Sequence, residues 1–443
     1  MKKIFLSAML FGMLLSAGIS VSSCSNDEDL SAVENRAADA ITVSGVLTGT
    51  HNWSGTVYLN GKVFLKNGTI NIAAGTQIIG MEKSAGSASA LIITKTGTIN
   101  AIGTASNPIV FTSAGVGKKW GGLVLMSTGA INQSEAQLIE GIQTSGLPTG
   151  VTLDDLKYGT PAQGQSDAAI AAINNVSSGT LKYVRVEYAG EDISEGAGNE
   201  LNSFTFGAVG SGTTLEYCQA YYGEDDGFEF FGGAVNGKYL VVTAADDDAF
   251  DFDFGYRGKI QFAVATIDPS LKYSKDPNGI ECDNENPYNP DHTPYTHPVL
   301  SNLTIVGTQS GSAASALKSC ANFRRGTQFT LVNSILYGFP KGILKETDNS
   351  FVLKNNIVAS IPAGNEFSVF TPDASNVVKT PTTIGLTSPW GAYKNATNLR
   401  PNASPANTGA GFSDLDSWFT TTTYKGAIAP IGSANWLMAT WVK

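Results

Sequence analysis

Two segments of the chain combine acidic side chains with alternating aromatic ones, and these residues are the best suited to chemistry. Residues 223–233 read GEDDGFEFFGG, and residues 246–255 read DDDAFDFDFG. Moving the second segment back by twenty-two residues aligns the pairs Asp225 with Asp247, Asp226 with Asp248, Phe228 with Phe250, Glu229 with Asp251 and Phe230 with Phe252. A repeat at this interval indicates that the acids of the two segments lie next to each other in space.

Carboxylates gathered in one place favour binding of a hard divalent cation. Ca²⁺ takes about six to eight oxygen ligands, and it would relieve the repulsion between like charges on neighbouring strands. We therefore predict a Ca²⁺ site with the candidate ligands Asp225, Asp226, Glu229, Asp247, Asp248, Asp251 and Asp253. Two alternatives stay open: the acids satisfy backbone amides in turns, or some of them act directly in catalysis.

The phenylalanines between these acids predict how the two segments are oriented. Successive side chains of a strand point to opposite faces, so the phenylalanines face a core while Glu229 and Asp251 point outward. A third row follows at residues 278–283, NGIECD, where Glu281 continues the column of Glu229 and Asp251. The acids, rather than the aromatics, therefore need a functional explanation.

A repeat of short strands runs through most of the chain. The pattern Leu-x-Asn/Tyr, followed by β-branched or small residues, occurs as LKYVRVEYAG from Leu181, LEYCQAYYG from Leu215, LSNLTIVG from Leu300, LVNSILYG from Leu331 and LKNNIVAS from Leu353. The phrase GTIN begins at both Gly68 and Gly97. Short strands at intervals of about twenty to thirty residues, without periodic helices between them, predict an all-β solenoid whose coils align like residues in columns.

Several phrases also carry a resemblance to a known family. GTINAIGTASNPIVFTS, WGGLVL, LKYVRVEYAG and DDGFEFFGG resemble right-handed parallel β-helix proteins of the pectin-lyase-like group, in particular surface lipoproteins of unassigned activity. The resemblance spans residues 41–360 and implies a right-handed parallel β-helix. It implies no single function, because this fold carries lyases, hydrolases, adhesins and binding modules.

The N-terminal residues predict export and lipid attachment. Lys2 and Lys3 precede an apolar run, and the sequence VSSC ends at Cys24. This pattern is typical of a lipoprotein signal peptide, residues 1–23, that is cleaved before a lipidated Cys24; an ordinary signal peptide is the alternative. The following SNDEDL resembles the export signal of surface lipoproteins in a group of Gram-negative anaerobes. It implies an outer-membrane lipoprotein at the cell surface, with the periplasmic face as the alternative.

The expected organisation has four parts. Residues 24–40 form an acidic tether, residues 41–360 form the β-helix with insertions at about 133–179 and 268–298, and residues 361–443 wrap and cap it. An open solenoid end exposes core and unpaired strand edges. We expect the last coil to be covered by a C-terminal aromatic cap of Trp418, Phe419, Trp436, Leu437 and Trp441.

Composition excludes some partners. A net charge of −10 and a pI near 4.9 argue against nucleic acid, which requires a basic surface. No other run of the sequence approaches the roughly 18 apolar residues of a membrane span, so the membrane would be reached only through Cys24. Cys218, Cys282 and Cys320 are expected as buried thiols, with one disulfide as the alternative.

The second insertion is rich in Tyr, Asn, Asp and Pro, which suits a glycan. Tyrosine rings stack on sugar C–H surfaces, and Asn and Asp accept hydroxyl protons. The candidate ligand-binding residues are Tyr273, Tyr288, Tyr295 and, outside the insertion, Arg257; a solvated loop packed on the solenoid is the alternative. The same insertion contains Asp291, His292 and His297, which are either a metal-binding group or an exposed loop.

Three function classes follow from these residues. The first is a non-enzymatic module that binds or adheres to glycans or proteins, because a solenoid presents a long rigid flank. The second is a Ca²⁺-dependent polysaccharide lyase or a glycoside hydrolase, with Arg257, Arg324 or Arg325 as bases for a lyase. The chain lacks the Gly-His-Gly turn of pectin-lyase-like hydrolases, so whether it is an enzyme stays open and no catalytic residue is assigned. The third is a structural component of the cell surface.

Overall fold

The computed structural model describes residues 40–81, 88–115, 120–190, 201–285, 287–346, 350–368 and 370–443. All of them belong to one compact unit, Ala38–Lys443. The expected signal peptide, the lipidation site Cys24 and all of the tether except residue 40 lie outside the described residues. No helix within the described ranges is long and apolar enough to cross a membrane.

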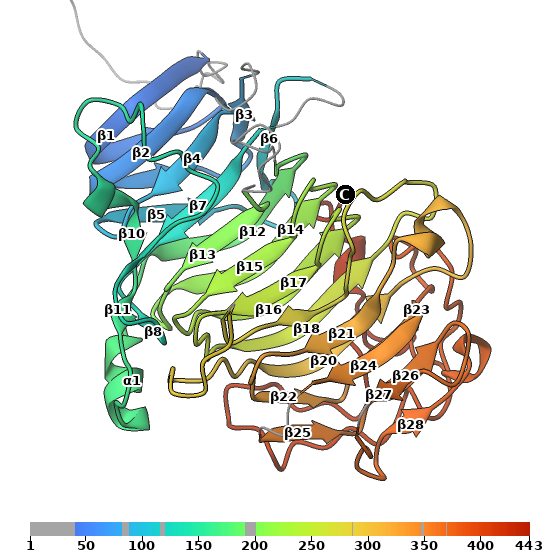
Figure 1. The fold of residues 1–443 in the computed structure, drawn as a ribbon. Helices are drawn as coiled ribbons and strands as arrows, with labels where there is room; N and C mark the ends of the chain where they lie inside the picture. The colour runs from blue at the N-terminus through green and yellow to red at the C-terminus, as the bar shows by residue number, and fades with distance from the viewer. Residues whose placement is uncertain are drawn as a thin grey trace, which may run out of the picture. The chain divides into compact units, whose positions relative to one another are not determined.

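The chain winds into a parallel β-helix, as predicted, and its coils present three faces (Figure 1). Face 1 is the column of β4 (Ala90–Ile93), β7 (Gly122–Met126), β13 (Phe204–Gly207), β15 (Phe228–Phe231), β17 (Phe250–Asp253), β19 (Glu281–Cys282), β21 (Ser319–Phe323), β24 (Lys341–Lys345) and β27 (Phe367–Ser368). Face 2 contains β5 (Gly97–Ile102), β22 (Phe329–Val332) and β25 (Phe351–Lys354), and face 3 contains β3 (Gln77–Gly80), β6 (Ile109–Ser113), β23 (Ile335–Phe339), β26 (Ile357–Ser360) and β28 (Val377–Val378).

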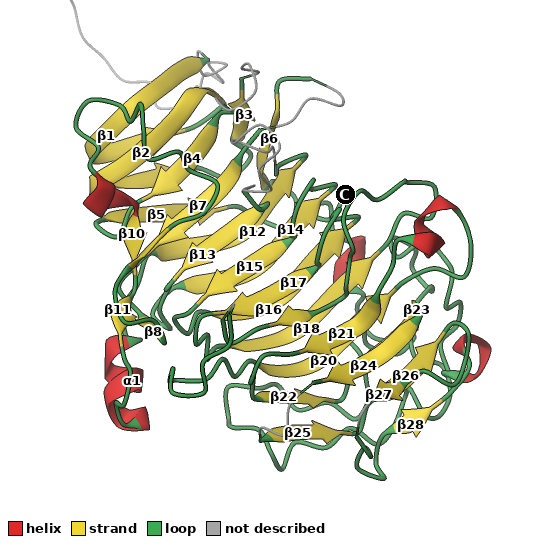
Figure 2. Cartoon of the chain, in the orientation of Figure 1, coloured by secondary structure: helices red, strands yellow, loops and turns green. Residues whose placement is uncertain are grey.

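Long strands join the faces. Faces 2 and 3 share β12 (Gly179–Glu187), β14 (Thr214–Tyr221), β16 (Asn236–Thr243), β18 (Lys259–Thr266) and β20 (Val299–Val306), while β1 (Ile41–Trp53) and β2 (Thr56–Ile72) span all three faces. Between β7 and β12 an excursion contains β8 (Ala130–Ile131), β9 (Gln137–Leu138), β10 (Lys157–Tyr158), β11 (Thr160–Pro161) and the short helix α1 (Asp167–Ile173). Figure 2 shows that α1 lies outside the stack of strands.

The strand register confirms the predicted columns. Phe228 pairs with Phe250, and Glu229 pairs with Asp251, in the twenty-two-residue alignment. The third row is confirmed as well, because Asp251 pairs with Glu281 on the next coil. β19, which carries this row, lies inside the segment expected as the second insertion, so that segment returns to face 1 before it ends.

Aromatic side chains fill the inside of face 1. The rings of Phe206 and Phe230 are stacked with centroids 5.0 Å apart, and those of Phe230 and Phe252 are 5.2 Å apart. All three are buried. Cys218, Cys282 and Cys320 are free, buried thiols, as expected, so no disulfide joins them.

The Asn or Tyr of the Leu-x-Asn/Tyr repeat makes the bend between faces 2 and 3. Tyr183, Tyr217 and Tyr239 all have a positive φ between 53° and 60°, and so does Asn302 at 57°. Asn adopts this left-handed conformation more readily than most residues. At the tyrosine positions ring stacking compensates, because Tyr217 lies 4.5 Å from both Tyr183 and Tyr239.

The C-terminal aromatic residues do not cap the last coil, contrary to our expectation. Trp441 packs edge-on against Tyr217 at 5.8 Å, and Trp436 packs against Tyr239 at 5.4 Å, both in the middle of the solenoid. The chain ends beside β14, where the Lys443 amide donates to Gln219 at 2.8 Å (Figure 1). The segment runs along face 3 because the outward side chains of that face are apolar and require cover.

The last coil is covered by a different side chain from those predicted. Phe370 packs edge-on against Phe351 and Phe367, at 5.5 and 5.9 Å. Trp418 instead lies over the Lys238 side chain, 4.5 Å from ring centroid to Nζ, on the flank of the solenoid.

The ring column predicts a large loss of stability when one ring is removed. Phe230→Ala leaves a cavity between two stacked rings, and we expect it to cost about 3–5 kcal/mol. Ile102→Ala is the control, because Ile102 is 51% exposed and should change stability by no more than about 0.5 kcal/mol. Urea unfolding of both variants measures this, and equal stability of the two would contradict the column.

Candidate functional site

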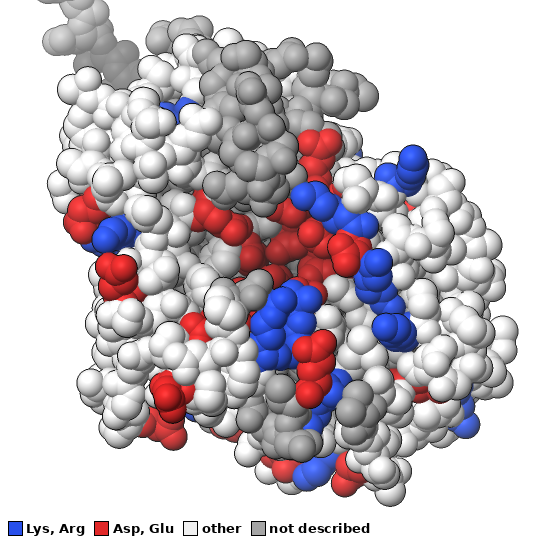
Figure 3. Space-filling view, viewed as in Figure 1, with Lys and Arg blue, Asp and Glu red and all other residues white. Residues whose placement is uncertain are grey.

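The predicted acids converge on a cavity of about 310 Å³ on the outer surface of face 1. We call it the acid cavity; its lining residues are Glu140, Asn202, Asp225, Asp226, Glu229, Asp247, Asp248, Asp251, Asp276, Glu281 and Arg324. Figure 3 shows the acidic side chains gathered in a hollow of the surface, with basic side chains along one side. Nine of the eleven lining side chains are carboxylates, so the cavity is strongly negative.

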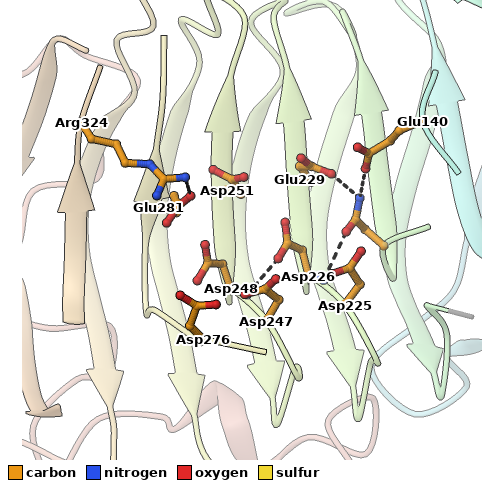
Figure 4. Close-up of a pocket in the computed structure, with 11 residues that line it drawn as sticks. Glu140, Asp225, Asp226, Glu229, Asp247, Asp248, Asp251, Asp276, Glu281 and Arg324 are labelled. Carbon is orange, nitrogen blue, oxygen red and sulfur yellow. Dashed lines mark hydrogen bonds and ion pairs between the residues drawn. The ribbon is translucent and has the colours of Figure 1, made fainter. Parts of the chain in front are cut away.

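The carboxylates form two rows, because two parts of each coil contribute to the cavity (Figure 4). Glu229, Asp251 and Glu281 point outward from consecutive strands of face 1. The second row comes from the turns that lead from face 3 back to face 1, and it contains Asp225, Asp226, Asp247 and Asp248. The repeat therefore stacks carboxylates of successive coils in two places, on the strands of face 1 and in the turns that precede them.

A ladder of side-chain oxygens joins the turns of successive coils. The Asp248 amide donates to Oδ1 of Asp226 at 2.8 Å, and the Asn278 amide donates to Oδ1 of Asp248 at 2.6 Å. The ladder begins with Oδ1 of Asn202, which accepts the Asp226 amide at 3.2 Å, and it continues from Asn278 to the Ser319 amide at 3.1 Å. Asp226 and Asp248 thus satisfy backbone amides with one oxygen, and asparagine does the same task at both ends.

Asn202 also joins the two rows at one end of the cavity. Its amide group donates to Glu140 at 3.0 Å and to Glu229. Glu140 comes from the excursion between β7 and β12, far from the strand repeat in sequence. The Glu140 carboxylate, which a loop supplies, therefore lies at the end of the row that Glu229, Asp251 and Glu281 form on the strands.

Burial and mutual repulsion disfavour the charged forms of these acids. Desolvation, followed by the neighbouring carboxylates, raises the pKa of Asp226, Glu229 and Asp248 well above the usual range. Desolvation also raises the pKa of Asp251 to about 7. The protein therefore holds these acids together near neutral pH against an electrostatic cost, which a bound cation would remove.

The geometry fits a hard cation. Three sets of acids offer oxygen atoms within 4.8 Å of one another: Asp225, Asp226 and Asp247; Asp226, Glu229 and Asp251; and Asp248, Asp251 and Glu281. Carboxylate oxygens are the ligands that Ca²⁺ prefers. Asp226 and Asp251 each belong to two sets, so the residues present would hold Ca²⁺, at more than one adjoining position, with carboxylates shared between them.

Arg324 closes the opposite end of the acid cavity. Its guanidinium donates to both oxygens of Asp283, at 3.0 and 2.9 Å, and to Glu281. Arg325 also binds Asp283, and Lys318 lies 3.9 Å from Asp276. Arg324 is therefore tied into ion pairs at the edge of the cavity.

Six of the seven predicted metal ligands line the cavity, and Asp253 does not. Asp253 follows Asp251 by two residues on β17, and its Oδ1 is buried without a hydrogen-bond partner in the described part of the chain. Burial and the adjacent Asp251 and Asp283 raise its pKa well above the usual range. Asp253 therefore lies beside the acid cavity, close to Asp251 and Asp283.

The predicted ligand-binding residues do not come together as one platform. Tyr273 is buried beneath its loop, 5% exposed, so its ring has no free face for a sugar. Tyr288 packs against Gly326, and the Tyr295 hydroxyl donates to Pro290 O at 2.8 Å. Arg257 lies 3.4 Å from Asp167 of α1, away from the acid cavity.

The histidines of the second insertion are also separate. His292 Nδ1 lies 2.6 Å from Glu285, whereas His297 Nε2 lies 3.3 Å from the Thr330 hydroxyl. Burial lowers the pKa of His297 to about 4. Neither histidine belongs to a metal-binding group among the described residues.

The repeat identified most of the cavity but missed residues that insertions and strand ends supply. Glu140, Asn202 and Asp276 lie outside the aligned segments, so no spacing in the sequence connected them with the acids. Glu281 was placed in the column but was not assigned as a ligand. Arg324 lies two residues beyond Asn322, the residue of β21 that pairs with Glu281, so its place at the cavity follows only from the register of β19 with β21.

The comparison with known protein families agrees with this architecture. The family model described as a pectate-lyase-like β-helix domain matches residues 48–423. The chain belongs to this family. Membership in the pectate-lyase-like β-helix family indicates a function related to carbohydrates in general. The solved structure titled "Crystal structure of pectate lyase Pel9A" is similar over 88% of each chain, with 12% sequence identity and a TM-score of 0.36. No curated protein matches the chain.

The raised pKa values determine how stability changes with pH when no cation is bound. In the unfolded chain an aspartate has a pKa near 3.8, whereas in the folded chain that of Asp251 is about 7. Between these values the folded state binds more protons than the unfolded state, so stability decreases as pH rises through this window and then levels off. Asp248 acts in the same direction.

Asp248→Asn should therefore stabilise the cation-free protein at pH 7.5, on the order of 1 kcal/mol or more, and leave it unchanged at pH 4. The asparagine keeps the acceptor for the Asn278 amide and removes only the charge. Thermal melting in chelator measures this. Asp154→Asn is the matched control, because its side chain is 76% exposed. A variant that melts at the wild-type temperature at pH 7.5 would show that Asp248 carries no electrostatic cost.

Proposed function

We propose that this protein is a calcium-dependent glycan-binding module, and that Ca²⁺ in the acid cavity contacts the ligand. The observation that carries the proposal is the convergence of nine carboxylates on one cavity of about 310 Å³. No single backbone role accounts for all of them: the turn ladder uses one oxygen each of Asp226 and Asp248, and it does not involve Asp251.

The chemistry favours a ligand with carboxylates or adjacent hydroxyls. Without cations the cavity would repel an acidic sugar, whereas a Ca²⁺ ion with about six to eight ligands can bind protein carboxylates and still accept sugar oxygens. The volume lies at the lower end of the roughly 300–1,000 Å³ that small-molecule sites occupy. One uronate unit with its cations is the ligand class that matches both charge and size.

The proposed location is the outer surface of the outer membrane. The lipoprotein signal before Cys24 and the acidic residues after it support lipid anchoring there. A surface-anchored module would hold polysaccharide close to the cell, which is consistent with an adhesion role.

A calcium-dependent polysaccharide lyase is the second candidate. Arg324 lines the same cavity, and in such an elimination a base removes the proton at C5 of the uronate while the bond from C4 to its oxygen breaks. The ion pairs of Arg324 with Asp283 and Glu281 favour a structural role for this side chain instead. We therefore favour binding of the glycan without cleavage.

Calorimetry with Ca²⁺, followed by oligogalacturonate or oligoalginate, tests the proposal on the chain that begins after Cys24. We expect wild-type protein to bind Ca²⁺, and to bind at least one uronate oligosaccharide only when Ca²⁺ is present. Asp226→Asn with Asp251→Asn should weaken Ca²⁺ binding at least tenfold, because these residues are shared between the proposed positions. Asp154→Asn is the control outside the cavity.

Unchanged Ca²⁺ affinity in the double variant would overturn the cation site. Uronate binding that persists in chelator would overturn its link to the ligand. Ultraviolet absorbance of unsaturated products, measured in the same samples, separates the lyase from the binding module, because only elimination produces the absorbing double bond.

A further inference from the structure

A second cavity, of about 440 Å³, lies between face 3 and the C-terminal segment. Its lining includes Tyr222, Thr266, Asp268, Thr308, Trp390 and Tyr393. Thr266 ends β18 and Tyr222 follows β14, so the cavity is at the ends of the face 3 strands. We call it the aromatic cavity; unlike the acid cavity, it combines three aromatic rings with a few polar groups.

Trp390 is held in a fixed position at the wall of the aromatic cavity. Tyr337 packs edge-on against it at 5.3 Å, and the Tyr337 hydroxyl donates to Pro389 O at 2.5 Å. The next residue, Gly338, permits close approach of the Trp390 ring, because a Cβ at this position would lie 3.0 Å from it. Trp390 itself is half-buried, so part of its ring surface is accessible and needs little ordering when a ligand binds.

Polar atoms at the cavity suit sugar hydroxyls. Asp268 accepts a hydrogen bond from the Tyr222 hydroxyl at 2.5 Å and others from Ser270, which fix its carboxylate. The Thr266 Oγ1 atom is buried and has no hydrogen-bond partner within the described part of the chain. A buried hydroxyl without a partner carries a free-energy cost that a ligand hydroxyl would remove.

We propose that the aromatic cavity binds an uncharged sugar unit, with Trp390 as the stacking surface and Asp268 and Thr266 as hydrogen-bonding groups. A flat indole face matches the C–H face of a hexose or pentose. The Asp268 carboxylate disfavours an anionic sugar, and the unpaired hydroxyl of Thr266 disfavours a wholly apolar ligand. The volume is within the roughly 300–1,000 Å³ of small-molecule sites.

This site is independent of the acid cavity and of the proposed Ca²⁺. One loop borders both cavities, since Asp268 lines the aromatic cavity and Asp276 lines the acid cavity. The loop is held to the solenoid by the Ser274 amide, which donates to Asp246 at 2.8 Å. A protein that uses both sites would select glycans containing neutral as well as acidic units.

The test is calorimetry in the presence of chelator, with hexasaccharides of cellulose, xylan, mannan, laminarin and starch as probes. We expect at least one probe to bind wild-type protein and to quench its tryptophan fluorescence. Trp390→Ala should weaken that binding at least tenfold. Trp418→Ala is the matched control, because Trp418 is a half-buried tryptophan of the same segment that lies over Lys238 instead.

Thr266→Val provides a second variant that keeps the side-chain shape and removes the hydroxyl; we expect severalfold weaker binding. Absence of binding by every probe, or equal binding by wild type and both variants, would overturn the proposal. Asp226→Asn with Asp251→Asn should leave neutral-sugar binding unchanged, so failure of this site and failure of the Ca²⁺ site are distinguishable.

Discussion

Parallel pairing of each coil with the next is the constraint on which the rest of this structure depends. Because the pairing aligns residues in fixed register, it places Phe228 on Phe250 inside the solenoid and Glu229 on Asp251 outside it. The inner column gains from burial and ring stacking. The outer column incurs repulsion in the same geometry, since adjacent strands lie only about 4.8 Å apart.

The turns show how the fold tolerates this repulsion. Asp226 and Asp248 each accept an amide from the next coil, which gives a carboxylate a structural task. Asparagine at positions 202 and 278 performs the same task without charge, so the ladder alone does not explain why the central members are acids. A structural and a cation-binding role are compatible, because the ladder occupies one oxygen of each carboxylate and leaves the other to face the cavity.

Much of this arrangement was predictable from the sequence, and the exceptions have physical causes. The alignment of two segments gave the register, because a solenoid converts sequence spacing directly into vertical distance. Glu140 was not predictable, since it enters from an excursion whose path is set by tertiary packing. The burial of Tyr273 depends on how one loop folds onto the solenoid. The position of Trp441 depends on an apolar flank that becomes visible only when the coils are assembled.

Cation binding in the acid cavity is tested most directly by a crystal structure grown with Ca²⁺. Anomalous difference density locates the ion without assumptions about its ligands. We predict a peak between Asp226, Glu229 and Asp251, a set that combines both rows of acids. A well-ordered acid cavity with no peak, in crystals grown with saturating Ca²⁺ at neutral pH, would contradict the claim and leave the carboxylates as members of the turn ladder and of surface ion pairs.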